Sequence, residues 1–172
     1  MGIISVEQAD RLLWLGRYTE RVYTTIRIYA ESYDTMIDEA VDSYPAYCQM
    51  MDIPNIYANK EDFLTRYPFD AANPDSILSN LTRAYDNALE LRESIGSESL
   101  AYIQLAIYEM QRTAEKHAPL VGLQRVNDNI LAFWGITDDS IDSQQIRNII
   151  KAGNKVCVCL LLLYFAADFK NL

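Results

Sequence analysis

The sequence predicts an all-α fold, an antiparallel helical bundle of about five main helices with an irregular Pro/Tyr-rich excursion after the first helix. Apolar residues recur at three- and four-residue spacing along most of the chain, and no useful length alternates with period two. Most of the prolines fall in one stretch between Tyr44 and Pro74. With 172 residues the chain can bury a sizeable core. We therefore expect residues 1–172 to form a single helical domain.

The first helix is expected to run from Ser5 to about Asp42. Ser5 is an N-cap residue, and Gln8 three positions later completes a capping box. Pro45 then ends the helix. Its apolar stripe repeats at helical spacing through Leu12, Leu13, Gly16, Tyr23, Ile26, Ala30, Tyr33 and Ile37.

Residues Tyr44 to Asn73 differ in kind from the rest of the chain. They hold three prolines and several tyrosines, with one short helical candidate at Lys60 to Arg66. A connection of this length is either a lid or a packed excursion with short helices. Its aromatic content favours packing, because disordered segments are poor in aromatic residues.

A second long helical segment is expected to begin at Asn73-Pro74, an N-cap residue followed by a proline in the first turn. Gly96 and Ser97 predict a kink or break within it. The apolar pattern then resumes at Leu100 and stops before Pro119. The stripe before the break consists of Ile77, Leu81, Ala84, Tyr85, Ala88, Leu91 and Ile95.

Two more helices follow, one from about Leu123 to Trp134 and one that begins near Asp138 to Ser143 and ends around Asp168. The last helix contains the longest apolar run of the chain, Val156 to Ala167. This run is too short to cross a bilayer as a helix, which takes about 20 apolar residues. We expect it to be buried nearly all round, at the centre of the bundle.

Charge and cysteine content narrow the classes of function. A formal net charge of -9 argues against a nucleic-acid binder and against docking to anionic lipid, both of which need a basic face. The three cysteines are an odd number without a disulfide framework, which is typical of a reducing compartment. Met1 to Val6 lacks the basic start and apolar core of an export signal. These features predict a cytoplasmic protein.

No catalytic or metal-binding motif is apparent, so the sequence leaves open whether the chain is an enzyme. The single histidine, His117, has no glutamate three residues before it, which excludes the usual dimetal site of helical bundles. Cys157 and Cys159 point in different directions on a helix and are expected to fill the core. There is no phosphate loop, nucleophile elbow or Ser-His-Asp set. We expect neither a cofactor nor a metal.

An acidic stripe lies near the end of the first helix. Glu31, Asp34, Asp38 and Asp42 follow one another at three- and four-residue steps. The stripe is either a cation site or a patch for a basic partner, or it is a solvated helix face. We favour the solvated face.

Charged residues on the apolar stripe form the better candidate site, because an unpaired charge in a core is costly. Glu20 shares the stripe of Gly16 and Tyr23, and Arg17 can reach Glu20 or Arg21 along the helix. If the first and second long segments pack antiparallel, their charges could pair across the core. The cluster is then either a buried ion-pair network that fixes helix register, which we favour, or a polar pocket for a ligand. Its candidate members are Arg17, Glu20, Arg21, Asn87, Arg92, Glu93 and Glu98.

These same residues carry a family resemblance. Leu12 to Tyr18, with Glu20-Arg21, resembles the opening signature of the bacterial alpha-E domain family (DUF403), a family of unknown function. Asp86 to Ala88, followed by Arg92-Glu93 and Glu98, resembles its central motif. Leu131 to Gly135 resembles a third landmark. In that family a later helix repeats the Gly-Arg-x-x-Glu-Arg pattern, whereas here Gly153 to Val158 retains the glycine and lacks the charges. The chain therefore resembles a shortened member.

The resemblance implies an all-helical fold and a cytoplasmic bacterial protein. Family members are often encoded beside ATP-grasp ligase-like and transglutaminase-like proteins, which implies a role in peptide or amide-bond synthesis or modification. We expect a helical interaction or accessory domain that partners such a protein. The alternative is an enzyme or small-ligand-binding bundle that uses the Arg/Glu/Asn cluster as a pocket. The sequence also leaves a homo-oligomer open.

Overall fold

The computed structural model describes residues 4–38, 43–116 and 119–168, and the side chains of these residues except Lys116 and those after Cys159. The described residues form seven α-helices and one short 3-10 helix, without a strand. The expected all-α fold is confirmed, with five long helices. The elements in chain order are α1 (Val6–Asp38), α2 (Tyr44–Met50), α3 (Lys60–Arg66), η1 (Tyr67–Phe69), α4 (Ile77–Glu90), α5 (Arg92–Lys116), α6 (Pro119–Ser140) and α7 (Gln144–Asp168).

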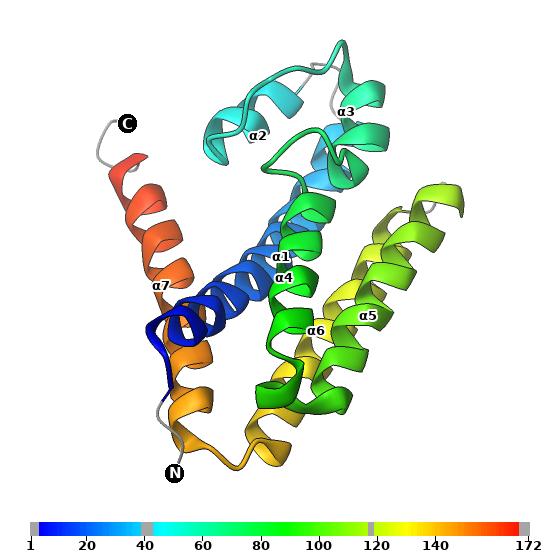
Figure 1. Ribbon diagram of the computed structural model, residues 1–172. Helices are drawn as coiled ribbons and strands as arrows, with labels where there is room; N and C mark the ends of the chain where they lie inside the picture. The colour runs from blue at the N-terminus through cyan, green and yellow to red at the C-terminus, as the bar shows by residue number, and fades with distance from the viewer. Residues whose placement is uncertain (1–3, 39–42, 117–118, 169–172) are drawn as a thin grey trace.

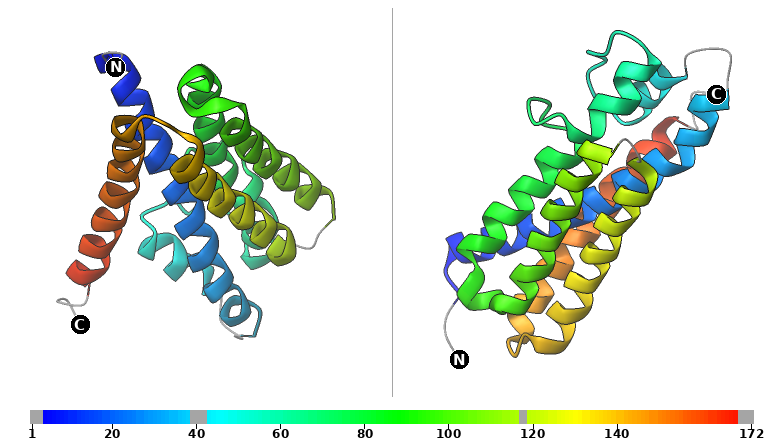
Figure 2. Two further views of the ribbon diagram at one scale, coloured as in Figure 1. Left: turned by 90° about the horizontal axis from the view of Figure 1, so that it is seen from below. Right: turned by 90° about the vertical axis from the view of Figure 1, so that its right-hand side faces the viewer.

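The long helix α1 lies between two parts of the molecule (Figure 1). Helices α4, α5 and α6 follow one another antiparallel on one side, and α7 packs against α1 on the other side (Figure 2). The segment with α2 and α3 covers the carboxyl end of α1, at the opposite end of the molecule from the α6–α7 connection. One helix therefore contacts all the principal parts of the fold.

The start of α1 follows the expected cap only in part. The Ser5 hydroxyl accepts a hydrogen bond from the Gln8 amide nitrogen at 3.1 Å, as an N-cap residue should. The Gln8 side chain does not return to Ser5 to complete a capping box. It donates to the Ser94 hydroxyl at 2.7 Å and thereby ties the start of α1 to the start of α5.

The Pro/Tyr-rich excursion is packed around an aromatic cluster, as expected from its composition. Phe63 of α3 is fully buried, and its ring stacks on Tyr67 at a centroid distance of 5.0 Å. Tyr29 of α1 and Tyr47 of α2 close the cluster from other sides. The helix expected at Lys60 to Arg66 is confirmed, whereas α2 was not foreseen, because Pro45 stands in its first turn rather than merely ending α1.

The second long segment begins later than predicted. Ser76, not Asn73, is the N-cap of α4, and its hydroxyl accepts from the Ser79 amide nitrogen at 3.0 Å. The Asn73 side chain instead accepts from the Asp75 amide and donates to the Tyr57 hydroxyl at 2.8 Å. Asn73 therefore closes the turn that joins the aromatic cluster to α4.

The segment is interrupted twice. Gly96 has φ +80° and ψ +158°, outside the helical region, so the predicted break is confirmed. A second interruption, at Leu91 between α4 and α5, was not predicted. The two interruptions together reverse the direction of the chain between α4 and α5, which pack side by side (Figure 1). They also place polar residues at this end of the bundle.

The predicted all-round burial of the apolar run in α7 is wrong for its described residues. Cys157 is buried, but Val156 and Val158 are 43 % and 37 % exposed and Cys159 is exposed. The physical reason is that α7 lies at the side of the bundle and packs principally on α1, so one stripe of the helix is covered. The side chains from Leu160 to Ala167 lie outside the described residues.

Candidate functional site

The α1–α7 contact is built around two glycines. A Cβ atom at Gly16 would collide with the backbone oxygen of Ile150, and one at Gly153 would collide with that of Leu13. The two helices therefore cross backbone against backbone, which only glycine permits. With its amide nitrogen turned toward Gly16, the Asn154 side chain donates to the Gly16 carbonyl oxygen at 2.8 Å. We call this contact the glycine crossing.

Glu20 lies one turn beyond Gly16 and carries a buried carboxylate. Its side chain is 9 % exposed, and it accepts a hydrogen bond from the Thr24 hydroxyl at 3.0 Å. Burial raises the pKa of Glu20 above its ordinary value of 4.5, and the Thr24 hydrogen bond opposes this increase. Among the described residues, no arginine forms an ion pair with Glu20.

Cys157 of α7 faces this part of α1. Burial raises the pKa of its thiol, the Glu20 carboxylate raises it further, and Arg21 and Arg17 lower it. The charges of all three residues of the first motif therefore act on the Cys157 thiol. Arg17 is half-buried and lies over the Trp14 ring, 4.1 Å from the ring centroid, where a cation–π contact holds it.

Arg21 points to the other side of α1, where it forms an ion pair with Asp75 at 2.8 Å. Asp75 lies in the turn before α4, so the pair ties α1 to the end of the aromatic excursion. Both side chains reach solvent, and such a pair contributes at most about 1 kcal/mol. Of these two residues, Arg21 connects α1 to another element, whereas Glu20 bonds to Thr24 within α1.

The third landmark of the sequence packs against the first. Phe133 of α6 is fully buried, and the Trp134 ring nitrogen donates to the Thr19 hydroxyl at 3.1 Å. Trp134 also meets Tyr23 edge to face, with 5.1 Å between ring centroids. The residue before Glu20 is therefore held by α6, while Glu20 itself faces α7.

The second half of the candidate cluster does not join the first. Asn87 is half-buried on α4, whereas Arg92, Glu93 and Glu98 are exposed around the start of α5. The expected pairing of these charges with α1 across the core is wrong, because the interruptions at Leu91 and Gly96 carry them to the end of the bundle. The charged residues of the two motifs therefore lie apart, although Ala88 of the central motif packs in the same core as Leu12 and Leu15.

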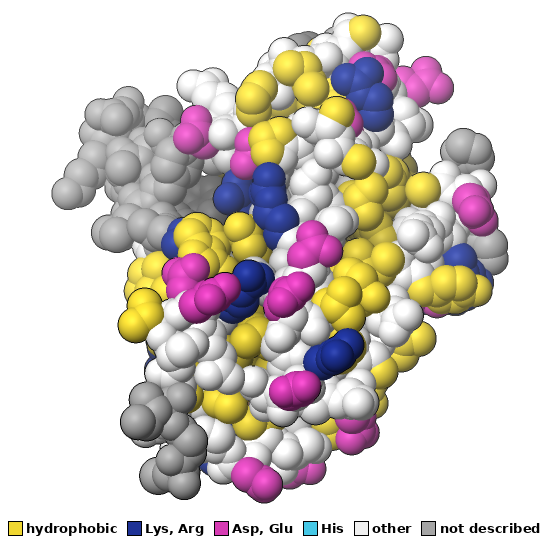
Figure 3. Space-filling model, in the orientation of Figure 1, with side chains coloured by type: hydrophobic (Ala, Val, Ile, Leu, Met, Phe, Trp, Pro, Cys, Tyr) yellow, Lys and Arg dark blue, Asp and Glu magenta, His cyan; other side chains and the backbone are white. Residues whose placement is uncertain are grey.

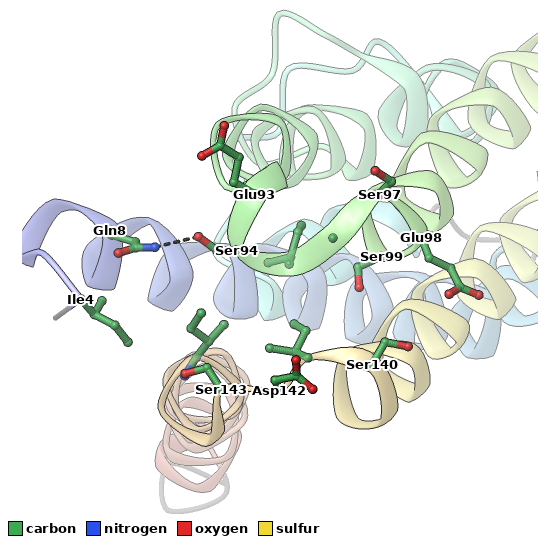
Figure 4. A pocket seen from close by; sticks show the side chains of 14 residues that line it. Ile4, Gln8, Glu93, Ser94, Ser97, Glu98, Ser99, Ser140, Asp142 and Ser143 are labelled. Atoms are coloured by element: carbon green, nitrogen blue, oxygen red, sulfur yellow. Dashed lines mark hydrogen bonds between the residues drawn. The ribbon is translucent and has the colours of Figure 1, made fainter. Parts of the chain in front are cut away.

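Glu93 and Glu98 instead line a cleft of about 610 Å³ at that end, which we call the end cleft (Figure 4). Its walls are the start of α1, the broken first turns of α5 and the α6–α7 connection from Ser140 to Ser143. Figure 4 shows the Glu93 carboxylate turned away from the connection and the Ser99 hydroxyl turned toward it. Buried isoleucines form the floor, namely Ile95, Ile141 and Ile146.

The structure places most of the other sequence candidates on the surface. Glu31, Asp34 and Asp38 are exposed, which agrees with a solvated face, and Asp42 and His117 lie outside the described residues. Cys159 is exposed, so its expected place in the core is wrong. Within the described part of the chain no group of three or more residues could hold a metal ion. On the face in Figure 3, lysine and arginine side chains form small separate groups among acidic ones.

Several residues that form these contacts were not among the candidate site residues predicted from the sequence. Thr24 sits four residues after Glu20, the spacing at which helical side chains meet, so this partner was within reach of the sequence. Asp75 and Trp134 are distant in sequence, and only the fold places them beside Arg21 and Thr19. In the family, the second copy of the Gly-Arg-x-x-Glu-Arg pattern has a Glu four residues after its glycine. In this chain Cys157 occupies that position, four residues after Gly153.

One family model matches most of the chain. Residues 7–156 match a family model described as a predicted alpha-helical domain with a conserved ER motif. Glu20-Arg21 is the only Glu-Arg dipeptide in the sequence, so the motif of that description falls on the residues at the glycine crossing. No curated protein and no solved structure shows significant similarity to the chain. Among the described residues, no helix has the length and apolar character needed to cross a membrane.

Proposed function

The chain belongs to the Alpha-E family, and from this premise we propose that it is a helical interaction domain that partners an ATP-grasp ligase-like or transglutaminase-like protein. The proposal takes residues 1–172 as one domain of a bacterial, cytoplasmic protein. The partner class comes from the proteins often encoded beside members of the family. The domain would then act as an accessory to peptide or amide-bond synthesis or modification.

The observation that carries the proposal is the exposed face of α7. Ile146, Ile150, Gly153 and Cys157 form the stripe that α7 buries. In the earlier turns the opposite face carries Lys151 and Lys155, as a solvated helix should. Near Val156 the exposed side chains of α7 become apolar, with Val156 and Val158 on the two flanks of the buried stripe and Cys159 on the opposite side. Exposed apolar side chains around a buried stripe favour a second contact.

The ER motif supports the same function indirectly. Glu20 faces Cys157, immediately after Val156, and the glycine crossing one turn earlier holds α7 at contact distance from α1. We therefore infer that the motif residues help to set the distance between α7 and α1, and with it the position of the exposed side of α7. We assign them a positioning role rather than direct contact with a partner.

The test is co-purification with one protein of each kind that is often encoded beside family members. The tagged wild-type chain is co-expressed with the ATP-grasp ligase-like protein or with the transglutaminase-like protein, and complexes are detected by size-exclusion chromatography with light scattering. We expect a stable complex with one of them. The double change Val156→Asp with Val158→Asp should weaken it at least tenfold, because two charges would be buried in an apolar contact.

The matched control is Val121→Asp, which adds a charge at an exposed valine of α6, away from α7. It should leave the complex intact. The proposal fails if the wild-type chain binds neither protein, or if the α7 variant binds as tightly as the control. A wild-type homo-oligomer that the α7 variant dissociates would identify a second copy of the chain as the partner, and would also overturn the proposal.

A pocket formed jointly by the Arg/Glu/Asn candidates has less support as a second function. Such a pocket would need the exposed residues around α5 to meet Arg17 and Glu20, and the fold separates them. Ligand binding by the end cleft is a different case, because it depends on other residues.

A further inference from the structure

We propose that the end cleft binds a small aliphatic primary amine. The lining of the cleft contains the carboxylates of Glu98 and Asp142, together with Glu93, whose carboxylate turns away from the α6–α7 connection, and no lysine, arginine or histidine. This composition favours a cationic ligand. The site does not depend on the partner proposed above, because α7 contributes to it only through Ile146 in its first turn.

A buried hydroxyl group is the second, independent observation. Ser99 is 1 % exposed, and its Oγ atom has no hydrogen-bond partner. An unpaired buried polar atom costs free energy. A bound ligand that donates a hydrogen bond to this oxygen would remove that cost. Figure 4 shows this hydroxyl turned from α5 toward the α6–α7 connection, across the cleft. An ammonium group has three donors and no acceptor, and an unpaired serine oxygen can accept from one of them.

One helix end on the wall of the cleft, that of α6, favours a cation. The first turn of α7 is capped by the Ser143 hydroxyl, which accepts from the Ile146 amide at 3.4 Å, so this amide is not free for an anion. Helix α6 ends at Ser140 on the wall of the cleft. The carboxyl end of a helix carries partial negative charge and stabilises cations. Glu98 on the facing wall adds a full negative charge.

The floor of the cleft explains why the amine should be aliphatic. Ile95, Ile141 and Ile146 are at most 8 % exposed and form an apolar base beneath the hydroxyl and carboxylate groups. Ile4 on the same lining is half-buried, and a methylene chain gains free energy by covering the apolar surface that remains open there, whereas a bare metal ion does not. The ligand is therefore expected to combine a short alkyl stem with a terminal ammonium group.

The test is calorimetric titration of the full chain with 1,5-diaminopentane at low salt. We expect saturable binding with a Kd below about 1 mM. The diol and the dicarboxylate of the same length, 1,5-pentanediol and glutarate, should not bind, because they lack the cation. Amide chemical shifts should move at Ser94 to Ser99 and at Ser140 to Ser143. Nα-acetyl-lysine methylamide presents the same stem on a peptide unit, and tighter binding of it would assign the amine to a lysine side chain.

Two variants decide the outcome. Ser99→Ala and Glu98→Gln should each weaken binding about tenfold, since hydrogen bonds to charged groups are the stronger class. Ser99→Ala should melt no lower than wild type, because the lost hydroxyl has no partner in the free protein. Glu90→Gln is the matched control, with the same charge change at an exposed position of α4 outside the cleft. The proposal is overturned if diamine does not saturate the chain, if pentanediol binds equally, or if Glu98→Gln behaves as the control.

Discussion

Glu20 holds a carboxyl group inside the contact between α1 and α7 with a single hydrogen-bond donor, the Thr24 hydroxyl. Burial raises its pKa, so the folded state retains this proton at pH values where the unfolded chain has released it. Stability therefore falls as the pH rises from the ordinary value of 4.5 through the folded pKa, and it stays lower above that pKa. The charge at Glu20 costs stability at neutral pH.

Because the charge on Glu20 lowers stability at neutral pH, we predict that Glu20→Gln stabilises the protein there, by on the order of 1 kcal/mol. The amide oxygen of glutamine can still accept from Thr24, and the desolvated charge is removed. The measurement is urea unfolding of both proteins at a series of pH values. The gain should shrink as the pH falls toward 4.5.

The favoured sequence interpretation, a buried ion-pair network, predicts the opposite result for this substitution. Breaking a buried pair costs on the order of 3–5 kcal/mol. A loss of that size at neutral pH, undiminished as the pH falls to 4.5 and shrinking only below it, would show that Arg17 or Arg21 neutralises Glu20 in solution. The sequence identified Glu20 as special because a charge stood on the apolar stripe. It could not show that Arg21 turns toward Asp75, since Asp75 is brought there by the aromatic excursion.

At the scale of elements, the glycine crossing determines the spacing of α1 and α7. We predict that Gly16→Ala or Gly153→Ala lowers the free energy of unfolding by at least about 1–3 kcal/mol. The added methyl group meets backbone oxygen, which cannot move aside as a side-chain end could. Thermal melting of the purified variants provides the measurement.

Gly135→Ala is the control for this prediction. Gly135 lies in α6, and a Cβ atom there would meet nothing within 4 Å. Because alanine favours helix over glycine, this variant should be stabilised by about 0.5–1 kcal/mol. Equal effects of Gly16→Ala and Gly135→Ala would mean that the two helices are not in backbone contact.

Elements whose ends are set by nearby residues could be predicted from the sequence. Elements whose ends depend on contacts with distant segments could not. The break at Gly96 and the helix from Lys60 to Arg66 follow from glycine and from apolar spacing in their own segments. The start of α4 was predicted at Asn73, because an Asn-Pro pair is a common helix start. In the fold, the Tyr57 hydroxyl accepts from the Asn73 amide and leaves Ser76 to cap the helix. The exposed side of α7 likewise depends on which helices pack beside it.

At the scale of the whole molecule, the aromatic excursion is a second centre of packing at the end of α1 away from the end cleft. We predict that Phe63→Ala lowers the free energy of unfolding by about 3–5 kcal/mol, since a fully buried ring is lost. Limited proteolysis should then cut between residues 43 and 76 in the variant first. Thr65→Ala, at an exposed position of the same helix, should change stability by no more than about 0.5 kcal/mol.

Rapid cleavage of this segment in the wild-type chain would contradict the prediction and favour a mobile lid. The sequence predicted a packed segment from its tyrosines alone. It gave no indication that the second cluster of charges lies at the other end of the molecule. That separation follows from the turn made at Leu91 and Gly96, and turn geometry in three dimensions is not encoded in helical periodicity.

The glycine crossing also has a consequence for the time order of folding. It joins the first long helix of the chain to the last one, so this contact has a large sequence separation, and long-range contacts form slowly. During synthesis α1 leaves the ribosome first, and its surface around Leu13 and Gly16 stays uncovered until α7 follows. The hairpin of α5 and α6 needs no such delay. Nascent chains that end before Gly153 should therefore expose that strip of α1 to chaperones.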